Sequence, residues 1–171
     1  VFQEPRLLPW RSIFDNLMYV QKVRDEAAKE RVHQALTRVG LGHAERKWPG
    51  QLSGGQQQRV GIARALSIEP DVLLMDEPFS ALDELSRDLM NMELQRICRE
   101  QDATAFLVTH SIQEAVILSD DIIVMKPRPG RIAEIVTVDL PRPRTLDMMT
   151  TPKFGEIVDH IRGMLDKGED M

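Results

Sequence analysis

Two adjacent carboxylates, Asp76 and Glu77, follow the apolar run DVLLM and precede Pro78. The run predicts a strand over 72–75 that is buried on both faces, and parallel sheets bind ligands beyond the carboxyl ends of their strands. An acidic pair at that edge suits phosphoryl transfer to water. One carboxylate holds Mg²⁺, directly or through water, and the other orients the attacking water and takes its proton. The string alone is equally compatible with an acidic strand end that caps a helix.

A serine followed by two glycines, in the string LSGGQQQR, predicts a helix that begins near Ser53. The Ser53 hydroxyl can cap this helix, and Gly54 and Gly55 leave backbone N–H groups unobstructed by a Cβ atom. Such a helix start binds phosphate through its N–H groups and its dipole. The alternative is an ordinary glycine-rich turn with a serine cap.

A histidine, His110, ends the predicted strand TAFLVTH. Because the carboxyl ends of parallel strands share one edge, we expect His110 beside the carboxylates, within reach of a γ-phosphate. In isolation, a surface histidine at a strand–loop junction is the commoner explanation. His33, His43 and His160 lack such a placement, and we interpret them as solvated.

Hydrophobic periodicity predicts the elements that position these side chains. Helices are expected from Ser12 and over 26–39, 53–67, 112–118 and 154–165, with a long amphipathic helix after Leu82. Strands are expected over 72–75, 104–109 and 121–125, followed by a β-rich stretch at 131–140. Alternating strands and helices imply an α/β fold with a mainly parallel sheet. We expect a small helical lobe at 12–50, an α/β core at 51–140 and a tail at 141–171 that ends in a helix.

Length and charge narrow the class of protein. The chain has 171 residues, a formal net charge of -5 and one cysteine, Cys98, so an intrachain disulfide is excluded. The negative charge gives no general attraction to nucleic acid or anionic membranes, and no apolar run approaches the roughly 18 residues of a membrane-spanning helix. The basic stretches 126–131 and 142–144 lack interleaved aromatic residues, so we interpret them as surface loops and expect no nucleic-acid partner.

The main phosphate cradle of a nucleotide triphosphatase, G-x-x-x-x-G-K-[ST], does not occur in this sequence. Gly50 and Gly55 have the glycine spacing, but Gln56 stands where lysine is needed. Two explanations compete: an N-terminally truncated chain, or a degenerate homologue. The first residue, Val1, is not an initiator methionine, which favours truncation, with the N-terminal strands and the phosphate loop absent.

With these residues assembled, the chain resembles the ATP-binding subunits of ABC transporters, a P-loop NTPase-like fold. LSGGQ resembles their signature motif, DVLLMDEP their Walker B motif and SALD their D-loop, while His110 resembles the switch histidine and Gln3 the Q-loop glutamine. All five lie in the order and spacing of the family, over nearly the whole chain.

The resemblance implies a role for each matched residue. Glu77 would be the general base, Gln3 and Asp76 would contact Mg²⁺ or its waters, and His110 would contact the γ-phosphate. ATP would lie between two subunits arranged head to tail, where the signature residues Ser53, Gly54, Gly55 and Gln56 contact ATP held by the opposite subunit. Asp83 would couple the two sites.

Partners and location follow from the same resemblance. The strings VTHSIQEAVILSDDIIVM, KPRPGRI and LPRPR resemble importers of nitrate, sulfonate, taurine and bicarbonate. This implies an ATPase that forms a dimer of identical subunits at the cytoplasmic face of the membrane, with transmembrane permease subunits and, indirectly, a solute-binding protein. Leu7, Leu8 and Trp10 would form an apolar surface for the permease; alternatively, Trp10 packs the two lobes together.

Other functions remain open from the sequence. A DNA-repair or chromosome-associated ATPase of the same superfamily would carry long coiled-coil insertions or a basic surface, and this sequence has neither. A pseudo-subunit that binds partners without hydrolysing ATP is the other alternative. Glu77 and His110 argue against loss of activity by drift, whereas the lack of a phosphate loop argues for it.

Nucleotide binding by the 171-residue chain alone tests the expectation that half of a site is missing. We predict no tight binding of ATP, because the lysine and the backbone cradle that wrap the phosphates are not in the sequence. Isothermal titration with Mg²⁺ and ATP measures this affinity. Saturable binding in the micromolar range would contradict the prediction.

Overall fold

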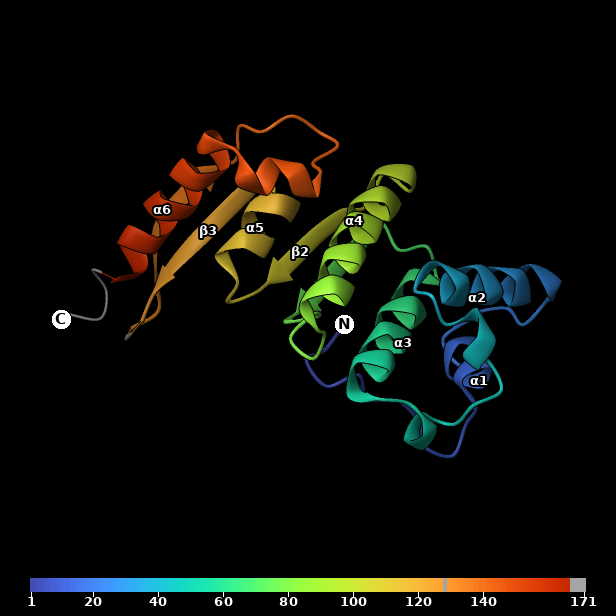
Figure 1. The fold of residues 1–171 in the computed structure, drawn as a ribbon. Coiled ribbons are helices and arrows are strands. Elements are labelled where there is room, and N and C mark those ends of the chain that lie inside the picture. Colours follow the sequence, from blue (N-terminus) through green and yellow to red (C-terminus); the bar gives the residue numbers. More distant parts are fainter. Residues whose placement is uncertain (128, 167–171) are drawn as a thin grey trace. The chain divides into compact units, whose positions relative to one another are not determined.

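The computed structural model describes residues 1–127 and 129–166 and divides into two compact units, residues 1–108 and 109–171 (Figure 1). Within the described ranges, no helix combines the length and the apolar character needed to cross a bilayer.

Three helices open the first unit: α1 (Ile13–Met18), α2 (Glu26–Arg38) and α3 (Gly54–Leu66). Their starts follow local sequence, because Ser12, Asp25 and Ser53 each accept a hydrogen bond from a backbone N–H of the first turn. The short 3-10 turns Gly42–Ala44 and Pro49–Gln51 connect α2 to α3. α2 packs against both α1 and α3. Their apolar faces form a core of fully buried side chains that includes Ile13, Leu17, Val32, Leu36, Val60 and Ile62.

A parallel strand pair completes this unit. β1 (Val72–Asp76) pairs with β2 (Thr104–Val108) from Val72↔Thr104 to Asp76↔Val108, and the long helix α4 (Glu84–Glu100) makes the connection. On the other side of β1, the Val1 amino group donates to Leu74 O at 2.6 Å, and Asp76 N–H donates to Val1 O at 3.0 Å. This is the bonding pattern of a parallel bridge to Met75. The parallel arrangement therefore continues past β1 to the first residue.

The expectation that β1 is buried on both faces is wrong for the described residues. Leu73 and Met75 are buried, whereas Val72 and Leu74 are exposed, with 62% of Leu74 accessible. In β2, Phe106 and Val108 are also exposed, and the register places them on the face of Val72 and Leu74. The composition of the strand suits two-sided burial, but no described segment covers this second face.

The second unit contains α5 (Ile112–Leu118), β3 (Asp121–Lys126), β4 (Arg131–Thr137), a 3-10 turn (Leu146–Thr150) and α6 (Pro152–Asp166). β3 and β4 form an antiparallel hairpin with a register shift between Val124 and Met125. α6 packs against β3 and α5 (Figure 1). The core consists of apolar side chains from the helices and from β3, among them Val116, Ile117, Val124, Phe154, Val158 and Ile161.

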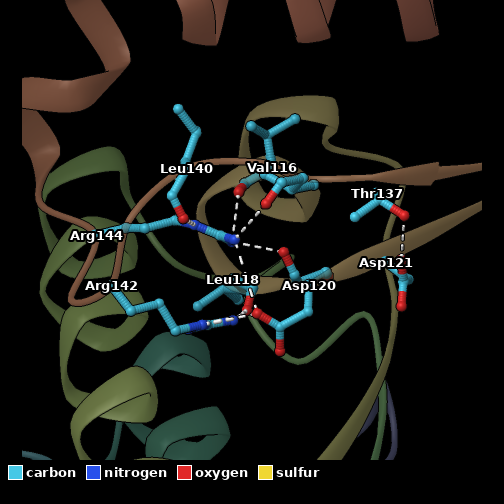
Figure 2. A network of polar contacts seen from close by, with 10 residues as sticks. Val116, Leu118, Asp120, Asp121, Thr137, Leu140, Arg142 and Arg144 are labelled. Atoms are coloured by element: carbon cyan, nitrogen blue, oxygen red, sulfur yellow. Dashed lines mark hydrogen bonds and ion pairs between the residues drawn. The ribbon is translucent and has the colours of Figure 1, made fainter.

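A buried arginine joins the segments of this unit. Arg144 is 2% exposed, and its guanidinium donates to Val116 O at 3.0 Å, Ser119 O at 2.5 Å and Val138 O at 3.1 Å (Figure 2). The first two carbonyls end α5, so the cation also meets the negative end of that helix. Burial lowers the pKa of Arg144, and the nearby positive charge of Arg142 adds to the effect.

The surface-loop interpretation of 142–144 is therefore wrong for Arg144, although it holds for Arg142 and Pro143, which are exposed. The exposed Arg142 makes an ion pair with Asp120 at 2.8 Å (Figure 2). A basic tripeptide gives no indication that one of its members turns inward to collect carbonyl groups. The inward turn also removes Arg144 from any surface that nucleic acid could contact.

Replacing Arg144 with alanine should destabilise the second unit by about 3 kcal/mol or more, because several buried carbonyls lose a charged donor at once. Native-state hydrogen exchange of peptides from α5 and β4 measures the loss. The matched control is Lys153→Ala, which removes an exposed ion pair with Asp139 at 2.7 Å in the same unit and should cost about 1 kcal/mol or less. Equal protection in the two variants would contradict the role assigned to Arg144.

Candidate functional site

A direct hydrogen bond joins two of the predicted site residues that are far apart in sequence. Gln3 Nε2 donates to Glu77 Oε2 at 3.0 Å. Gln3 is exposed and Glu77 is half-buried, so the contact lies at the surface of the first unit. A carboxylate that accepts from a fixed amide has a defined orientation, which a general base requires.

The backbone of Glu77 is held in an uncommon conformation. Its φ is +42°, in the left-handed region that few non-glycine residues adopt, and residues before proline normally take extended angles. Two contacts fix it: Glu77 N–H donates to Val108 O at 2.8 Å, and Glu77 O accepts from the Ser80 hydroxyl at 3.0 Å. Strained residues of this kind cluster at functional sites. The DEP string did not predict this strain.

Asp76, the other carboxylate, is the last residue of β1 and is exposed. No group of three or more His, Cys, Asp or Glu side chains that could hold a metal ion occurs among the described residues. Mg²⁺ at nucleotide sites commonly uses one or two carboxylates, several waters and the substrate phosphates. The exposed Asp76 carboxylate, together with Gln3, whose side chain bonds the adjacent residue Glu77, fits that incomplete set of protein ligands.

The serine-glycine helix start has the predicted cap. The Ser53 hydroxyl accepts from Gln56 N–H at 3.3 Å, and Gln56 Oε1 accepts from Ser53 N–H at 3.0 Å, which together form a capping box. A Cβ atom added to Gly54 would meet open space, whereas one added to Gly55 would lie 3.1 Å from Ala81 O. Gly55 is thus required for close packing, and Gly54 and Ser53 remain exposed. The exposed helix start fits an anionic ligand.

The packing of Gly55 also brings the signature string next to the segment that follows the carboxylates. Within that segment, Asp83 caps α4: its Oδ1 accepts from Ser86 N–H at 2.9 Å. The hydrogen bonds from the Ser86 backbone and hydroxyl hold the pKa of Asp83 below its usual value. Asp83 has a structural role here, and its coupling role stays a prediction.

His110 belongs to the second unit, where it is exposed and directly precedes Ser111, the N-cap of α5. Its proximity to Glu77 stays a prediction. The expected solvated state is confirmed for His43 and His160, which are exposed, although His160 also bonds Glu134 at 3.0 Å. It is wrong for His33, which is half-buried and pairs with Glu45. Pairing with glutamates distant in sequence was not visible in the local pattern.

Sequence reasoning missed three residues of α3 that hold the segment carrying Gln3. Gln58, Gly61 and Arg64 contact residues 2–6 through hydrogen bonds or close packing. The available signal was the spacing of three residues from Gln58 to Gly61 and from Gly61 to Arg64, which predicts that they are neighbours on the helix surface.

Comparison with known proteins identifies the family of the chain. Residues 1–80 match the family described as ABC transporter. The chain is 42% identical to the taurine import ATP-binding protein TauB of Rhizobium johnstonii, over 100% of this chain and 68% of that protein. It is 48% identical to the aliphatic sulfonates import ATP-binding protein SsuB 2 of Nocardia farcinica, over 84% of this chain and 58% of that protein. Nitrate import and bicarbonate transport ATP-binding proteins match at 42% and 45% identity.

A solved structure supports the fold. The dimeric, post-hydrolysis state of the ATP-binding cassette MJ0796 bound to ADP and Pi superposes with a TM-score of 0.71 at 30% identity, over 82% of this chain and 63% of that one. The chain belongs to the ABC transporter family of ATP-binding proteins. The predicted fold class and family are thereby confirmed. The chain spans little more than half the length of several curated relatives.

The lowered pKa of Asp83 gives a pH-dependent prediction. The ionised carboxylate stabilises the fold fully above the pKa of an unfolded aspartate, about 4, and this stability is lost as pH falls through the lower folded-state pKa. Asp83→Asn keeps a capping side chain but lacks the charge. The difference in denaturation midpoint between the two proteins should therefore be present at pH 7 and shrink at the acidic end. A difference that stays constant down to pH 2 would contradict this.

Proposed function

We propose that this chain is part of the ATP-hydrolysing subunit of an ABC importer, working with a second ATPase subunit at a shared interface. The observation that carries the proposal is the hydrogen bond between Gln3 and Glu77 at the carboxyl end of β1. This hydrogen bond lies in the same compact unit as the exposed helix start Ser53–Gln56. A base for water and a phosphate-binding helix start are two of the parts that ATP hydrolysis requires.

Glu77 is the general base, and the Gln3 amide orients its carboxylate toward the attacking water. Asp76 and Gln3 would hold Mg²⁺ or its waters, and His110 would contact the γ-phosphate. Bound Mg²⁺ supplies charge neutralisation on the phosphate oxygens. Ser53, Gly54, Gly55 and Gln56 contact ATP held by the opposite subunit. The dimeric form of the related cassette bound to ADP and Pi supports this division between two subunits.

The proposed cargo is a small anion such as nitrate, a sulfonate or taurine, because relatives at 42–48% identity bear those import names. The subunit acts at the cytoplasmic face of the membrane with permease subunits, and a solute-binding protein selects the cargo. Trp10 is 68% exposed, which favours a partner surface over packing between lobes. The buried Asn16 amide fixes this loop, since Asn16 Oδ1 accepts from Leu8 N–H at 2.7 Å.

A pseudo-subunit that binds partners without hydrolysing ATP is the second candidate, and it rests on the missing G-x-x-x-x-G-K-[ST] string. The two proposals differ in what Glu77 does. In an importer ATPase it is needed for turnover, and in a pseudo-subunit its replacement changes nothing.

Glu77→Gln separates these proposals in an ATPase dimer that contains this chain. Hydrolysis should fall about 10²- to 10⁴-fold because the base is lost while the shape is kept, and ATP affinity should change little. Steady-state phosphate release and equilibrium nucleotide binding give the two values. Glu84→Gln, an exposed glutamate at the start of α4, serves as control and should retain full turnover. Unchanged turnover in Glu77→Gln would remove Glu77 from its role and favour the pseudo-subunit.

A further inference from the structure

Three side-chain positions of α3 lie against the backbone that carries Gln3. Gln58, Gly61 and Arg64 are spaced three residues apart, so each is the surface neighbour of the next along the helix. Gln58 Nε2 donates to Phe2 O at 3.3 Å, ahead of Gln3. Arg64 donates to Pro5 O at 2.7 Å and to Arg6 O at 3.0 Å, behind Gln3. The segment is therefore held on both sides of the residue that bonds Glu77.

Gly61 allows the segment to come this close. A Cβ atom at Gly61 would lie 3.1 Å from Pro5 Cβ and 3.4 Å from Pro5 Cα, and neither atom is the end of a flexible side chain. Gly61 is buried, so added volume has no exit toward solvent. Any residue larger than glycine must displace Pro5, two positions from Gln3.

The planar guanidinium of Arg64 is suited to bonding two backbone carbonyls at once. One guanidinium reaches two successive carbonyls, of which the second belongs to Arg6, where φ is +45° and the backbone is in the left-handed region. A planar fork fixes two acceptors at once, which a lysine ammonium cannot do with the same geometry. Arg64 thus stabilises a turn that a non-glycine residue seldom adopts.

The N-terminus of α3 also contacts the segment that follows Glu77. There Gly55 packs on Ala81 O, just beyond Glu77, and Ser53 and Gly54 are exposed. One rigid element therefore contacts both the segment that carries Gln3 and the segment that follows Glu77. A shift of α3 along or about its axis displaces these two contacts together.

We propose that Arg64 and Gly61 are positioning residues that place the Gln3 amide within hydrogen-bond distance of Glu77. They thereby connect this hydrogen bond to the helix start at Ser53–Gln56. The catalytic consequence rests on the proposed function. When the helix start binds nucleotide held by the opposite subunit, α3 transmits the resulting displacement to the Gln3–Glu77 hydrogen bond of this chain. The positioning itself is a property of the chain and is testable without turnover.

The structural test follows the Gln3 side-chain amide by ¹⁵N–¹H spectroscopy of this chain, with the signal assigned from its loss in Gln3→Asn. Arg64→Lys should shift that signal. The control is Arg59→Lys on the same helix, where the arginine donates to Val39 O at 3.2 Å, away from the Gln3 segment; it should leave the signal unchanged. A folded Arg64→Lys protein with an unmoved Gln3 signal would overturn the proposal.

Gly61→Ala provides a second route if Arg64→Lys fails to fold, because it keeps the guanidinium and displaces Pro5. It too should shift the Gln3 signal. Gly50→Ala, where an added Cβ atom meets nothing within 4 Å, should not. Identical Gln3 signals in the two alanine variants would overturn the proposal independently of Arg64.

The functional test is a double-mutant cycle on turnover in the assembled ATPase dimer. Arg64→Lys should lower kcat on the order of tenfold, since small misplacements of reacting groups are costly, and leave KM for ATP within about twofold. In a Gln3→Ala background, Arg64→Lys should lower kcat less than about twofold, because Arg64 acts through Gln3. Additive effects would overturn the link. A wild-type dimer without turnover would instead count against the proposed function, and the amide signals would still decide the positioning.

Discussion

The hydrogen bond between Gln3 Nε2 and Glu77 Oε2 is the contact on which the candidate site depends. It joins the first residues of the chain to the end of β1, 74 positions away. Neither partner is held by its local sequence alone. Glu77 is fixed by Val108 and Ser80 in a left-handed conformation, and Gln3 is fixed by the side chains of α3. The site is thus a product of tertiary packing.

Much of the secondary structure could be predicted from the sequence, because its determinants are local. The caps at Ser12, Ser53 and Ser111 lie within three residues of the groups they satisfy, and apolar side chains are frequent in α4 and β2. The paired carboxylates and the glycine-rich helix start were also visible as short strings. The family match confirms that such strings, in the right order, carry real information about fold.

The remainder could not be predicted, because it depends on partners distant in sequence. Arg144 resembled a surface residue in a proline-rich basic stretch, yet it is buried and bonds carbonyls at the end of α5 and just after β4. β1 resembled a two-sided core strand, yet Val72 and Leu74 are exposed. Gln58 resembled another polar residue of a glutamine run, yet it is fully buried and bonds Phe2 O. In each case the side chain type is compatible with two environments, and only packing selects one.

In the proposed dimer, the helix start of one copy and the carboxylates of another face a shared nucleotide. Paramagnetic broadening by Mn²⁺ and ATP in the assembled dimer measures this most directly, since Mn²⁺ replaces Mg²⁺ and broadens signals of nearby nuclei. We expect the amide signals of Gly54 and Gly55 to broaden together with those of Asp76 and Glu77. Sharp Gly54 and Gly55 signals alongside broadened Asp76 and Glu77 signals would contradict it.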